Sequence, residues 1–304
     1  TALLGRYDVV HAHWPELMVD GHRALGRLSR RALAALTVAR WRLTRIPVVR
    51  TLHNLERPEG ISRFDHAVLS GIDAATALDI ALNDVTPPRD GLPQTTIPHG
   101  HYRDWFAEHP SPQPVADRVA YVGLIRRYKG VEDLVDAFKG WDRPTASLHI
   151  AGRPSSPELL DGLRSAAASD DRISIDPRFL DDADFATAIR SAELIVLPYR
   201  HMHNSGTALA ALSLDRPVLV PDNAVNRALA EECGPGWVHL FRDAITAADM
   251  ERAWNDSRER SGVPDLSRRE WAAAGVQHRE AFARALRGPA SSPTLGGRHR
   301  KPLS

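Results

Sequence analysis

The sequence Tyr121-Val122-Gly123-Leu124-Ile125-Arg126-Arg127-Tyr128-Lys129-Gly130 is typical of a β-strand that ends in glycine, followed by a basic turn and a helix. Glycine at the end of a strand lets the backbone approach a ligand. Arginine can donate two parallel hydrogen bonds to phosphate oxygens, and lysine adds a mobile point charge. Because ligands of open α/β sheets bind at the carboxyl ends of strands, the stretch indicates a phosphate site on Gly123, Arg126 and Lys129. The alternative is a solvated basic turn.

A second candidate anion site lies downstream, at His203-Asn204-Ser205-Gly206-Thr207. It follows the apolar run Leu194 to Pro198 and precedes an alanine-rich helix. The start of a helix presents free N–H groups and the positive end of a dipole to an anion. An ordinary Ser or Asn helix cap is the alternative. Together the two turns predict a diphosphate site with one cationic and one dipolar side.

Short aliphatic runs alternate with segments of helical period along the chain, which favours βα units and parallel sheets. After Arg118 the alternation predicts one doubly wound unit of about six strands, with helical spacing at 181–192 and 208–214. The clearest strands are Tyr7–Ala12, Pro47–Leu52, Arg118–Gly123, Ser147–Gly152, Arg172–Ile175, Glu193–Pro198 and Pro217–Pro221.

The length of 304 residues predicts two domains. Three prolines between Pro110 and Pro114 forbid regular structure, so we place the boundary there. The first clear strand begins at Tyr7 without a preceding glycine-rich turn, so we expect the first domain to be incomplete at its start. The predicted parts are an acceptor-side Rossmann-like domain (1–109), a donor-binding domain (115–262), a C-terminal helix (263–287, clearest from Arg268 to Arg287) and a disordered Gly/Pro/Ser-rich tail (288–304).

The composition is that of a globular protein, with 43% hydrophobic and 25% charged residues. The formal net charge is +1, which argues against a nucleic-acid partner. Cys233 is the single cysteine and is expected to be a small buried residue in a reducing compartment. The sequence has neither a run long enough to span a membrane nor a targeting signal, which favours a cytoplasmic location.

Seven segments together resemble the GT-B fold glycosyltransferases that use nucleotide-sugars, of the family 4 type. They are DVVHAHWPE, VVRTLHN, TTIPHGHYRDWF, GLIRRYKGVEDLVDAF, LHIAG, FLDDADFATAIRSAELIVLPY and NSGTALAALSLDRPVLVP. The resemblance implies an α/β protein of two Rossmann-like domains with a cleft between them, and the transfer of a hexose from a nucleotide-sugar. It assigns the donor diphosphate to Arg126 and Lys129, and to the turn Ser205, Gly206 and Thr207.

The chain departs from this family at two positions. Retaining members carry two glutamates eight positions apart, and here those positions hold Met202 and Ala210. Asn204 is our candidate to replace the first contact. For the ribose the candidates are Asp222, Glu231 and Glu232.

The NSGT variant with SLDRPVLVP resembles bacterial exopolysaccharide β-mannosyltransferases, which invert the anomeric carbon. This resemblance implies GDP-mannose as the donor, a glycan or lipid-linked glycan as the acceptor, and a role in polysaccharide biosynthesis. The missing glutamates favour an alternative, a non-catalytic GT-B partner that binds nucleotide or glycan for another transferase. A third possibility, a sugar-phosphate enzyme such as an epimerase, would need its own group of catalytic bases beside the phosphate turns, and the sequence shows no such group.

An inverting reaction needs a general base, which takes the proton from the acceptor hydroxyl. By the resemblance, His53 in Thr51-Leu52-His53 faces the donor sugar. The candidate catalytic residues are His53, His13 and Glu16; the other acids and histidines at these strand ends are His11, Glu56 and Glu59. Each histidine has a purely structural role as its alternative, and we leave His99 and His101 outside the catalytic set.

We expect no metal and no cofactor. Arg126, Lys129 and the helix start at Ser205 neutralise the charge that develops on the leaving diphosphate. The run Asp181-Asp182-Ala183-Asp184 is better explained as acids at a helix N-terminus.

The segment from Gly21 to Arg50 contains eight arginines and no acid. Its apolar residues fall at helical spacing, namely Leu25, Leu28, Ala32, Ala35, Leu36 and Ala39. A basic amphipathic helix binds anionic lipid, which would make the protein peripheral to the inner face of the membrane. The alternative, slightly favoured, is a core-facing helix whose apolar stripe covers the first domain's sheet.

Overall fold

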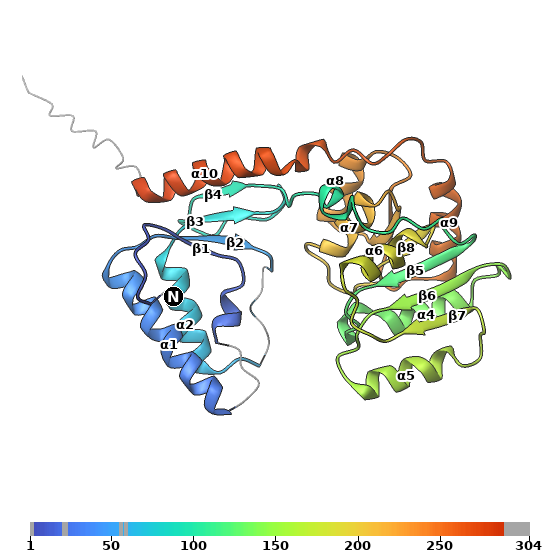
Figure 1. The fold of residues 1–304 in the computed structure, drawn as a ribbon, viewed down its shortest axis with the longest axis horizontal. Helices are drawn as coiled ribbons and strands as arrows, with labels where there is room; N and C mark the ends of the chain where they lie inside the picture. The colour runs from blue at the N-terminus through green and yellow to red at the C-terminus, as the bar shows by residue number, and fades with distance from the viewer. Residues whose placement is uncertain (1–2, 20–23, 55–56, 58–59, 289–304) are drawn as a thin grey trace, which may run out of the picture. The chain divides into compact units, whose positions relative to one another are not determined.

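The computed structural model describes residues 3–19, 24–54, 57 and 60–288, and the chain forms two compact α/β units (Figure 1). Unit 1 comprises residues up to Leu82, 86–97, and 275 onward; unit 2 comprises 83–85 and 98–274. The expected class of two parallel-sheet α/β units is confirmed. The predicted tail from 289 onward lies outside the described residues.

Unit 1 is built on a parallel sheet in the order β1-β2-β3-β4. Its strands are β1 (Val10–Ala12), β2 (Val48–Leu52), β3 (Thr76–Ala81) and β4 (Gln94–Thr96). Its helices are η1 (Pro15–Met18), α1 (Ala24–Leu43), α2 (Arg63–Ala75) and most of α10 (Trp271–Arg287). Because successive strand residues point to opposite faces, one face packs on α1 and α2, and His11 on the other face contacts α10.

Helix α1 buries a different stripe from the one that its sequence suggested. Its buried side chains are Ala34, Thr37, Val38 and Trp41, which pack with Val68 and Ile72 of α2. Of the predicted stripe, Leu28, Ala32, Leu36 and Ala39 are exposed, and Ala35 packs partly against this core. The core-facing interpretation of that stripe is therefore wrong: the helix is apolar on two sides, and the side with the large Trp41 covers the sheet.

Unit 2 contains a six-stranded parallel sheet in the order β10-β9-β8-β5-β6-β7. The strands are β5 (Arg118–Val122), β6 (Ser147–Ala151), β7 (Ile173–Asp176), β8 (Leu194–Val196), β9 (Val218–Pro221) and β10 (Val238–Phe241). The helices are α3 (Arg103–Phe106), η2 (Arg127–Lys129), α4 (Val131–Lys139), α5 (Pro157–Ala167), α6 (Asp182–Arg190), α7 (Gly206–Ser213), α8 (Ala224–Cys233), α9 (Ala247–Arg258) and η3 (Ser267–Arg269). Counted from β5, this is the strand order 3-2-1-4-5-6 of a doubly wound nucleotide-binding sheet.

Side-chain caps fix where the helices of unit 2 begin. Ser156, Asp181, Ser205 and Asn223 each accept a hydrogen bond from the N–H three residues on. The predicted acids at the start of α6 are such a cap. Cys233 is buried, as expected, and burial chiefly raises the pKa of its thiol to about 12.

The predicted domain boundary at the proline-rich segment is wrong, because the contacts between residues divide the chain at another place. Residues 98–109, which we assigned to the first domain, belong to unit 2. Phe106 is part of the core of unit 2, and the Arg190 guanidinium donates to the carbonyl oxygens of His109 and Pro110, both at 2.8 Å. The prolines are therefore fastened to α6, and the units divide near Pro98.

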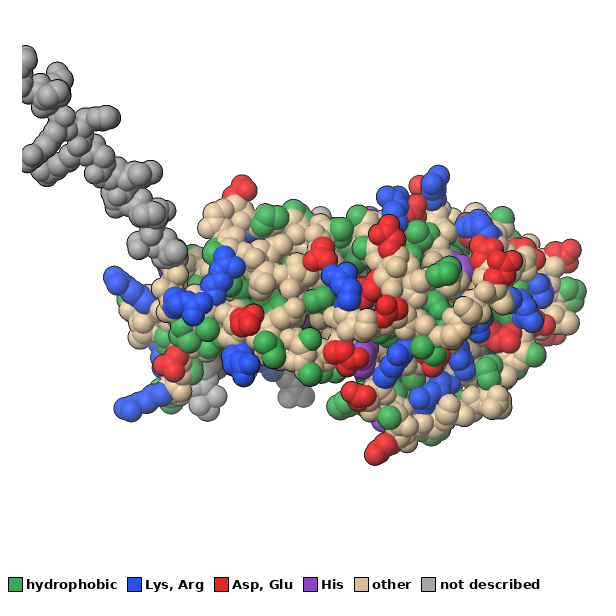
Figure 2. All heavy atoms as spheres, turned by 90° about the horizontal axis from the view of Figure 1, so that it is seen from above, with side chains coloured by type: hydrophobic (Ala, Val, Ile, Leu, Met, Phe, Trp, Pro, Cys, Tyr) green, Lys and Arg blue, Asp and Glu red, His purple; other side chains and the backbone are tan. Residues whose placement is uncertain are grey.

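Figure 2 shows acidic and basic side chains interspersed on the face seen there, in keeping with the small net charge. No helix in the described part of the chain is both long and apolar enough to cross a membrane.

Candidate active site

The carboxyl ends of β5 and β8 lie side by side, since these strands are neighbours at the centre of the sheet. The chain leaves β5 toward β6 on one side and leaves β8 toward β9 on the other. Such a reversal of strand order is where doubly wound sheets bind ligands. Gly123 follows β5, and Ser205 follows β8 after a short loop, so both predicted phosphate turns emerge at this point.

Glycine geometry shows how closely the turns pack. Gly123 has φ of 129°, and a Cβ placed on it would lie 3.4 Å from Thr207 Oγ1. A Cβ on Gly152, which follows β6, would lie 1.9 Å from the carbonyl oxygen of Gly123. The segments after β5, β6 and β8 therefore meet at Gly123, and the close approach of Gly152 to its carbonyl oxygen leaves no room for a side chain at position 152.

The two predicted cations of the β5 turn are placed differently. Arg126 is exposed, in extended conformation, immediately before η2. Lys129 Nζ donates to the Tyr199 hydroxyl at 3.1 Å and lies 4.7 Å from the centroid of the Tyr199 ring. Tyr199 follows β8, so it fixes the ammonium at the same edge of the sheet, while the Arg126 side chain is solvent-accessible.

The start of α7 is the dipolar side of the predicted diphosphate site. Ser205 Oγ accepts from Ala208 N at 3.2 Å, so the predicted cap is present. The N–H groups of Gly206 and Thr207 have no acceptor among the described residues. Asn204 Oδ1 accepts from Asn83 Nδ2 at 3.0 Å. The cap uses only one of the free N–H groups of the helix start, so those of Gly206 and Thr207 stay available to an anion.

The three acidic residues that are candidates to bind the ribose differ in whether their carboxylates are already held in ion pairs. Asp222, just after β9, is paired with Arg227 and Arg242, and the hydrogen bond from Arg227 is the main reason that its pKa is lowered. Glu232 is held by Arg269 in a bidentate pair, with both bonds at 2.7 Å. Glu231 is exposed on α8 and forms no ion pair with the described residues.

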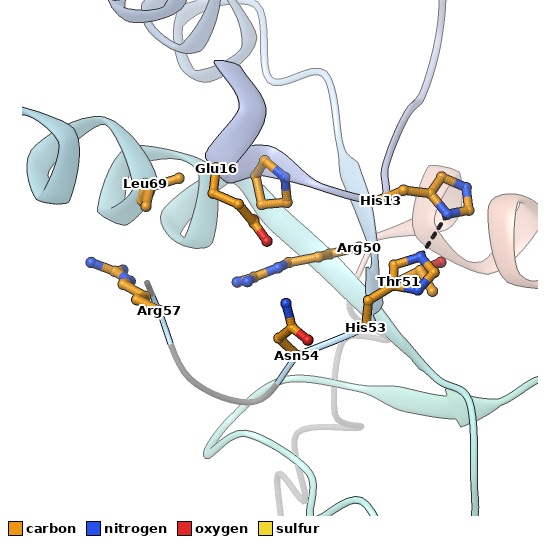
Figure 3. A pocket seen from close by; sticks show the side chains of 9 residues that line it. His13, Glu16, Arg50, Thr51, His53, Asn54, Arg57 and Leu69 are labelled. Atoms are coloured by element: carbon orange, nitrogen blue, oxygen red, sulfur yellow. Dashed lines mark hydrogen bonds between the residues drawn. The ribbon is translucent and has the colours of Figure 1, made fainter. Parts of the chain in front are cut away.

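In unit 1 the ends of β1 and β2 bring two of the predicted catalytic residues together. His13 Nδ1 and His53 Nε2 are 3.0 Å apart and share a hydrogen bond (Figure 3). The indole of Trp14 stacks on the His53 ring at 4.2 Å between centroids. Stacking and the shared bond together fix both imidazoles.

His11 and α10 extend this cluster in a way that the sequence did not reveal. His11 Nε2 lies 2.8 Å from Thr51 Oγ1, and the ring of His278 is 5.5 Å from that of His11, centroid to centroid. Phe282 completes the apolar side of His11. Burial first, and then the charges of His13, His278 and His53, lower the pKa of His11 to about 4. His11 is therefore neutral at pH 7 and suits a structural role better than that of a proton acceptor.

Glu16, the third predicted catalytic residue, lies on η1 and lines a pocket with His13 and His53 (Figure 3). The other lining residues are Pro15, Arg50, Thr51, Asn54, Arg57 and Leu69. The candidate bases Glu56 and Glu59 lie outside the described residues. His99 and His101 belong to unit 2 and are not among the residues that line this pocket.

Comparison with known proteins identifies the family. Residues 116–253 match the model for glycosyl transferases group 1. A GDP-mannose:glycolipid 4-beta-D-mannosyltransferase from Xanthomonas campestris pv. campestris is 43% identical over 287 residues, which cover 94% of this chain and 82% of the relative. A second protein of that name and pathovar is 42% identical over the same lengths. The chain belongs to the group 1 glycosyltransferases.

Solved structures give this glycosyltransferase the GT-B fold. Sucrose-phosphate synthase from Thermosynechococcus elongatus has a TM-score of 0.61 at 18% identity, covering 91% of this chain and 74% of that one. Anabaena HepE in complex with UDP has a TM-score of 0.64 at 14% identity, covering 83% and 76%. The predicted GT-B fold, hexosyltransferase class and family are thus confirmed.

The glutamate positions of retaining glycosyltransferases are occupied by residues that cannot replace them. Ala210 is buried within α7. The backbone oxygen of Met202 accepts from Asn223 at 2.9 Å, and its sulfur lies 3.6 Å from Asn226 Nδ2. Neither position offers a carboxylate to a sugar.

Over the described ranges, no three His, Cys, Asp or Glu side chains are arranged to hold a metal ion. The histidine cluster of this glycosyltransferase is thus a set of hydrogen-bonded and stacked rings.

Proposed function

We propose that the protein transfers mannose from GDP-mannose to a sugar hydroxyl of a glycolipid, with inversion at the anomeric carbon. The observation that carries this proposal is the 43% identity to the Xanthomonas mannosyltransferase, which extends over 94% of the chain and so includes both units. That relative's name specifies a β-linked product, and forming a β-mannoside from α-linked GDP-mannose requires inversion. The absence of both glutamates at Met202 and Ala210 agrees with this outcome.

Unit 2 is proposed to bind the donor and stabilise the leaving group. As the bond from the anomeric carbon to the diphosphate breaks, negative charge develops on GDP. Arg126 and Lys129 offset that charge, as do the N–H groups of Gly206 and Thr207. Asn204 is proposed to bind the sugar, and Gly123 to give the diphosphate access to the backbone. The proposal includes no metal, so transfer should persist in EDTA.

Unit 1 is proposed to provide the base. The acceptor oxygen attacks the anomeric carbon and loses its proton to the His13–His53 pair, whose hydrogen bond spreads the acquired charge over two rings. Glu16 lines the same pocket as the pair and is proposed to stabilise the imidazolium or to act as the base itself. Replacing His53 by Ala should lower kcat by at least about a hundredfold and leave GDP binding unchanged.

The donor site is tested by thermal unfolding with GDP, UDP and ADP. Ligand at about 100 times Kd adds about 2.7 kcal/mol of stability, and we expect this only with GDP. Lys129→Ala should abolish the shift. Lys139→Ala is the matched control, because this lysine at the end of α4 is exposed and donates to the carbonyl oxygen of Ala166. A shift with UDP alone would refute GDP-mannose as the donor.

Transfer is tested with radiolabelled GDP-mannose and a bacterial glycolipid fraction. We expect label in the lipid phase that β-mannosidase releases and α-mannosidase does not. Binding of GDP without transfer or donor hydrolysis would support the non-catalytic partner instead. The missing glutamates, which suggested that alternative, are equally consistent with an inverting enzyme, because such an enzyme uses a general base in place of them.

Contact with the membrane is proposed for α1. Leu28, Leu33, Leu36 and Leu43 are each more than half exposed on this helix, the last at 84%. Arg42 and Arg45 near its end are also exposed. Exposed leucines beside arginines match the interface of an anionic bilayer. A glycolipid acceptor lies in that interface, so the proposed location is the cytoplasmic face of the membrane.

Vesicle sedimentation tests this contact. We expect the protein to bind phosphatidylglycerol vesicles and not phosphatidylcholine vesicles, and Leu36→Ser with Leu43→Ser to weaken binding. Val263→Ser is the control, since Val263 is 58% exposed but lies in unit 2. Equal losses for the α1 and Val263 variants would show that α1 is not the docking surface.

A further inference from the structure

The pocket beside the histidine pair contains an arginine whose hydrogen-bonding capacity is largely unused. Arg50, in β2, points to the face of the sheet covered by α2, and its Nη1 donates to Asp73 Oδ1. Its Nε is buried and has no hydrogen-bond partner. A buried N–H without an acceptor costs on the order of 1–3 kcal/mol. Within the described residues, that Asp73 bond is the only hydrogen bond of the Arg50 side chain.

The charges around Arg50 are unbalanced. Asp79 is fully buried and is held by Arg89 through Nε at 2.6 Å and Nη2 at 2.7 Å. Asp73 is shared by Arg50, Arg57 and Arg89. Three guanidinium groups thus face two carboxylates, which leaves one positive charge in excess.

The ionisation of Asp73 shows that this cluster stays charged. Burial alone would raise the pKa of Asp73. The hydrogen bond from Arg57 and the charges of Arg50 and Arg89 outweigh burial and lower that pKa. Asp73 remains a carboxylate at neutral pH, but it cannot neutralise Arg50 and Arg57 together.

The pocket is a shallow depression that opens to solvent. Its enclosed part is small, about 10 Å³, and the volume reaches about 380 Å³ only when the open space at its mouth is counted, so a ligand would lie at the mouth. In the view of Figure 3, the Arg50 guanidinium lies between the side chains of Glu16 and Asn54. Glu16 forms no ion pair with the described residues, but its carboxylate lines the same pocket and competes with an anion for these guanidinium groups. Asn54 adds an exposed amide donor.

We propose that Arg50 and Arg57 form an oxyanion-binding subsite, which holds a carboxylate or phosphate of the acceptor beside the His13–His53 pair. An oxyanion there would accept from the guanidinium groups of Arg50 and Arg57, whose planar N–H donors match the geometry of such anions. Because His13 and His53 line the same pocket, an acceptor anchored in this way has its sugar next to the proposed base. The inference that the anion belongs to the acceptor rests on the proposed function; binding of the anion does not.

Binding is tested by NMR of the arginine Nε–H groups in the full chain, saturated with GDP so that the donor turns are occupied. The probes are acetate, inorganic phosphate and acetamide, which is the uncharged match of acetate. Arg50→Gln identifies the Arg50 signal. Arg63→Gln identifies that of an exposed arginine at the start of α2, which serves as the control.

We expect a saturable shift of the Arg50 signal with acetate or phosphate, and none with acetamide. The anion that saturates at the lower concentration indicates whether the acceptor's group is a carboxylate or a phosphate. Glu16→Gln should tighten anion binding, because it removes a competing charge. An Arg50 signal that moves only together with that of Arg63, or equally with acetamide, would overturn the proposal.

Kinetics test the link to the acceptor. Arg50→Gln and, independently, Arg57→Gln should raise the acceptor KM about ten- to a hundredfold, the range expected for a charge-assisted hydrogen bond. The KM for GDP-mannose should not change, and Arg63→Gln should change neither constant. An unchanged acceptor KM in both variants would overturn the assignment to the acceptor. If the wild-type protein transfers no mannose at all, the proposed function fails, while the NMR result still decides the subsite.

Discussion

His11 is surrounded by groups that disfavour its protonation. His13, His53 and His278 lie near it, Phe282 covers its ring, and its Nε2 shares a hydrogen bond with the hydroxyl of Thr51. With burial, these neighbours lower its pKa from 6.5 to about 4. The unfolded chain therefore binds one more proton than the folded chain between those two pH values. Native stability must fall in that window as the pH is lowered.

His11→Gln should remove this dependence. Gln retains a partner for Thr51 but does not titrate, so the free energy of unfolding should fall less steeply from pH 6.5 to 4 in the variant than in the wild type. Urea unfolding at a series of pH values measures both slopes. Other histidines with lowered pKa, such as His99 and His239, are present in both the wild type and the variant, so their contributions cancel in the comparison of slopes. Parallel slopes would show that His11 is protonated at its ordinary pKa.

Gly130 is needed where η2 meets α4. Its φ is 63°, and a Cβ would lie 2.2 Å from the carbonyl oxygen of Pro198. We expect Gly130→Ala to destabilise the protein by at least about 2 kcal/mol and to weaken GDP binding, since Lys129 is its neighbour. Gly162→Ala in α5 is the matched control, because it meets open space and should stabilise by about 0.5–1 kcal/mol. Equal melting temperatures for the two variants would contradict this.

Site residues could be predicted from the sequence where their position follows from their own strand, and not where they meet partners that are far away in the sequence. Gly123, Lys129 and Ser205 follow strands and could be placed by the rule for parallel sheets. His278 could not, because it belongs to a helix far along the chain and meets His11 only in the fold. The partners of Arg50 were hidden for the same reason: Asp73 lies on α2 and Arg89 in the loop before β4.

Among the elements, strands with aliphatic runs between clear breaks were predicted to within a few residues. β3 was missed, because α2 runs directly into it at Thr76 with no glycine or proline between them, and because Asp79 is charged. β4 and β10 were also missed, being only three and four residues long. Helix α10 begins at Trp271, three residues later than predicted, because the chain forms η3 first.

Helix α10 is held to unit 1 by one narrow face. Ala281 and Ala285 are buried on that face, beside His278 and Phe282. Ala281→Glu should therefore cost at least about 2 kcal/mol, the penalty of burying a charge without a partner. Ala273→Glu, an exposed alanine on the same helix, should cost less than about 0.5 kcal/mol. Differential scanning calorimetry compares them, and similar losses would show that α10 is not packed as described.

At the scale of the whole molecule, the two units have cores of unequal size. The described core of unit 2 includes buried residues from five of its six strands, from Val119 to Phe241, and Ile173 and Ile175 of β7 pack against it, whereas the core of α1, α2 and β2 is small. Because stability rises with buried apolar area, we expect two unfolding transitions, of which the first belongs to unit 1. Hydrogen exchange followed by mass spectrometry assigns them. GDP should raise only the second, and a single transition raised as a whole would contradict independent unfolding.

The membership of α10 in unit 1 also bears on synthesis. Most of unit 2 (residues 98–274) precedes in the chain the part of α10 that contacts His11, so it is translated earlier. Unit 2 can therefore begin to fold before unit 1 is complete, although it comes second in sequence. The strands of unit 1 are thus made before unit 2 but gain their last helix after it, and the proposed catalytic histidines reach their final arrangement only once α10 has been made.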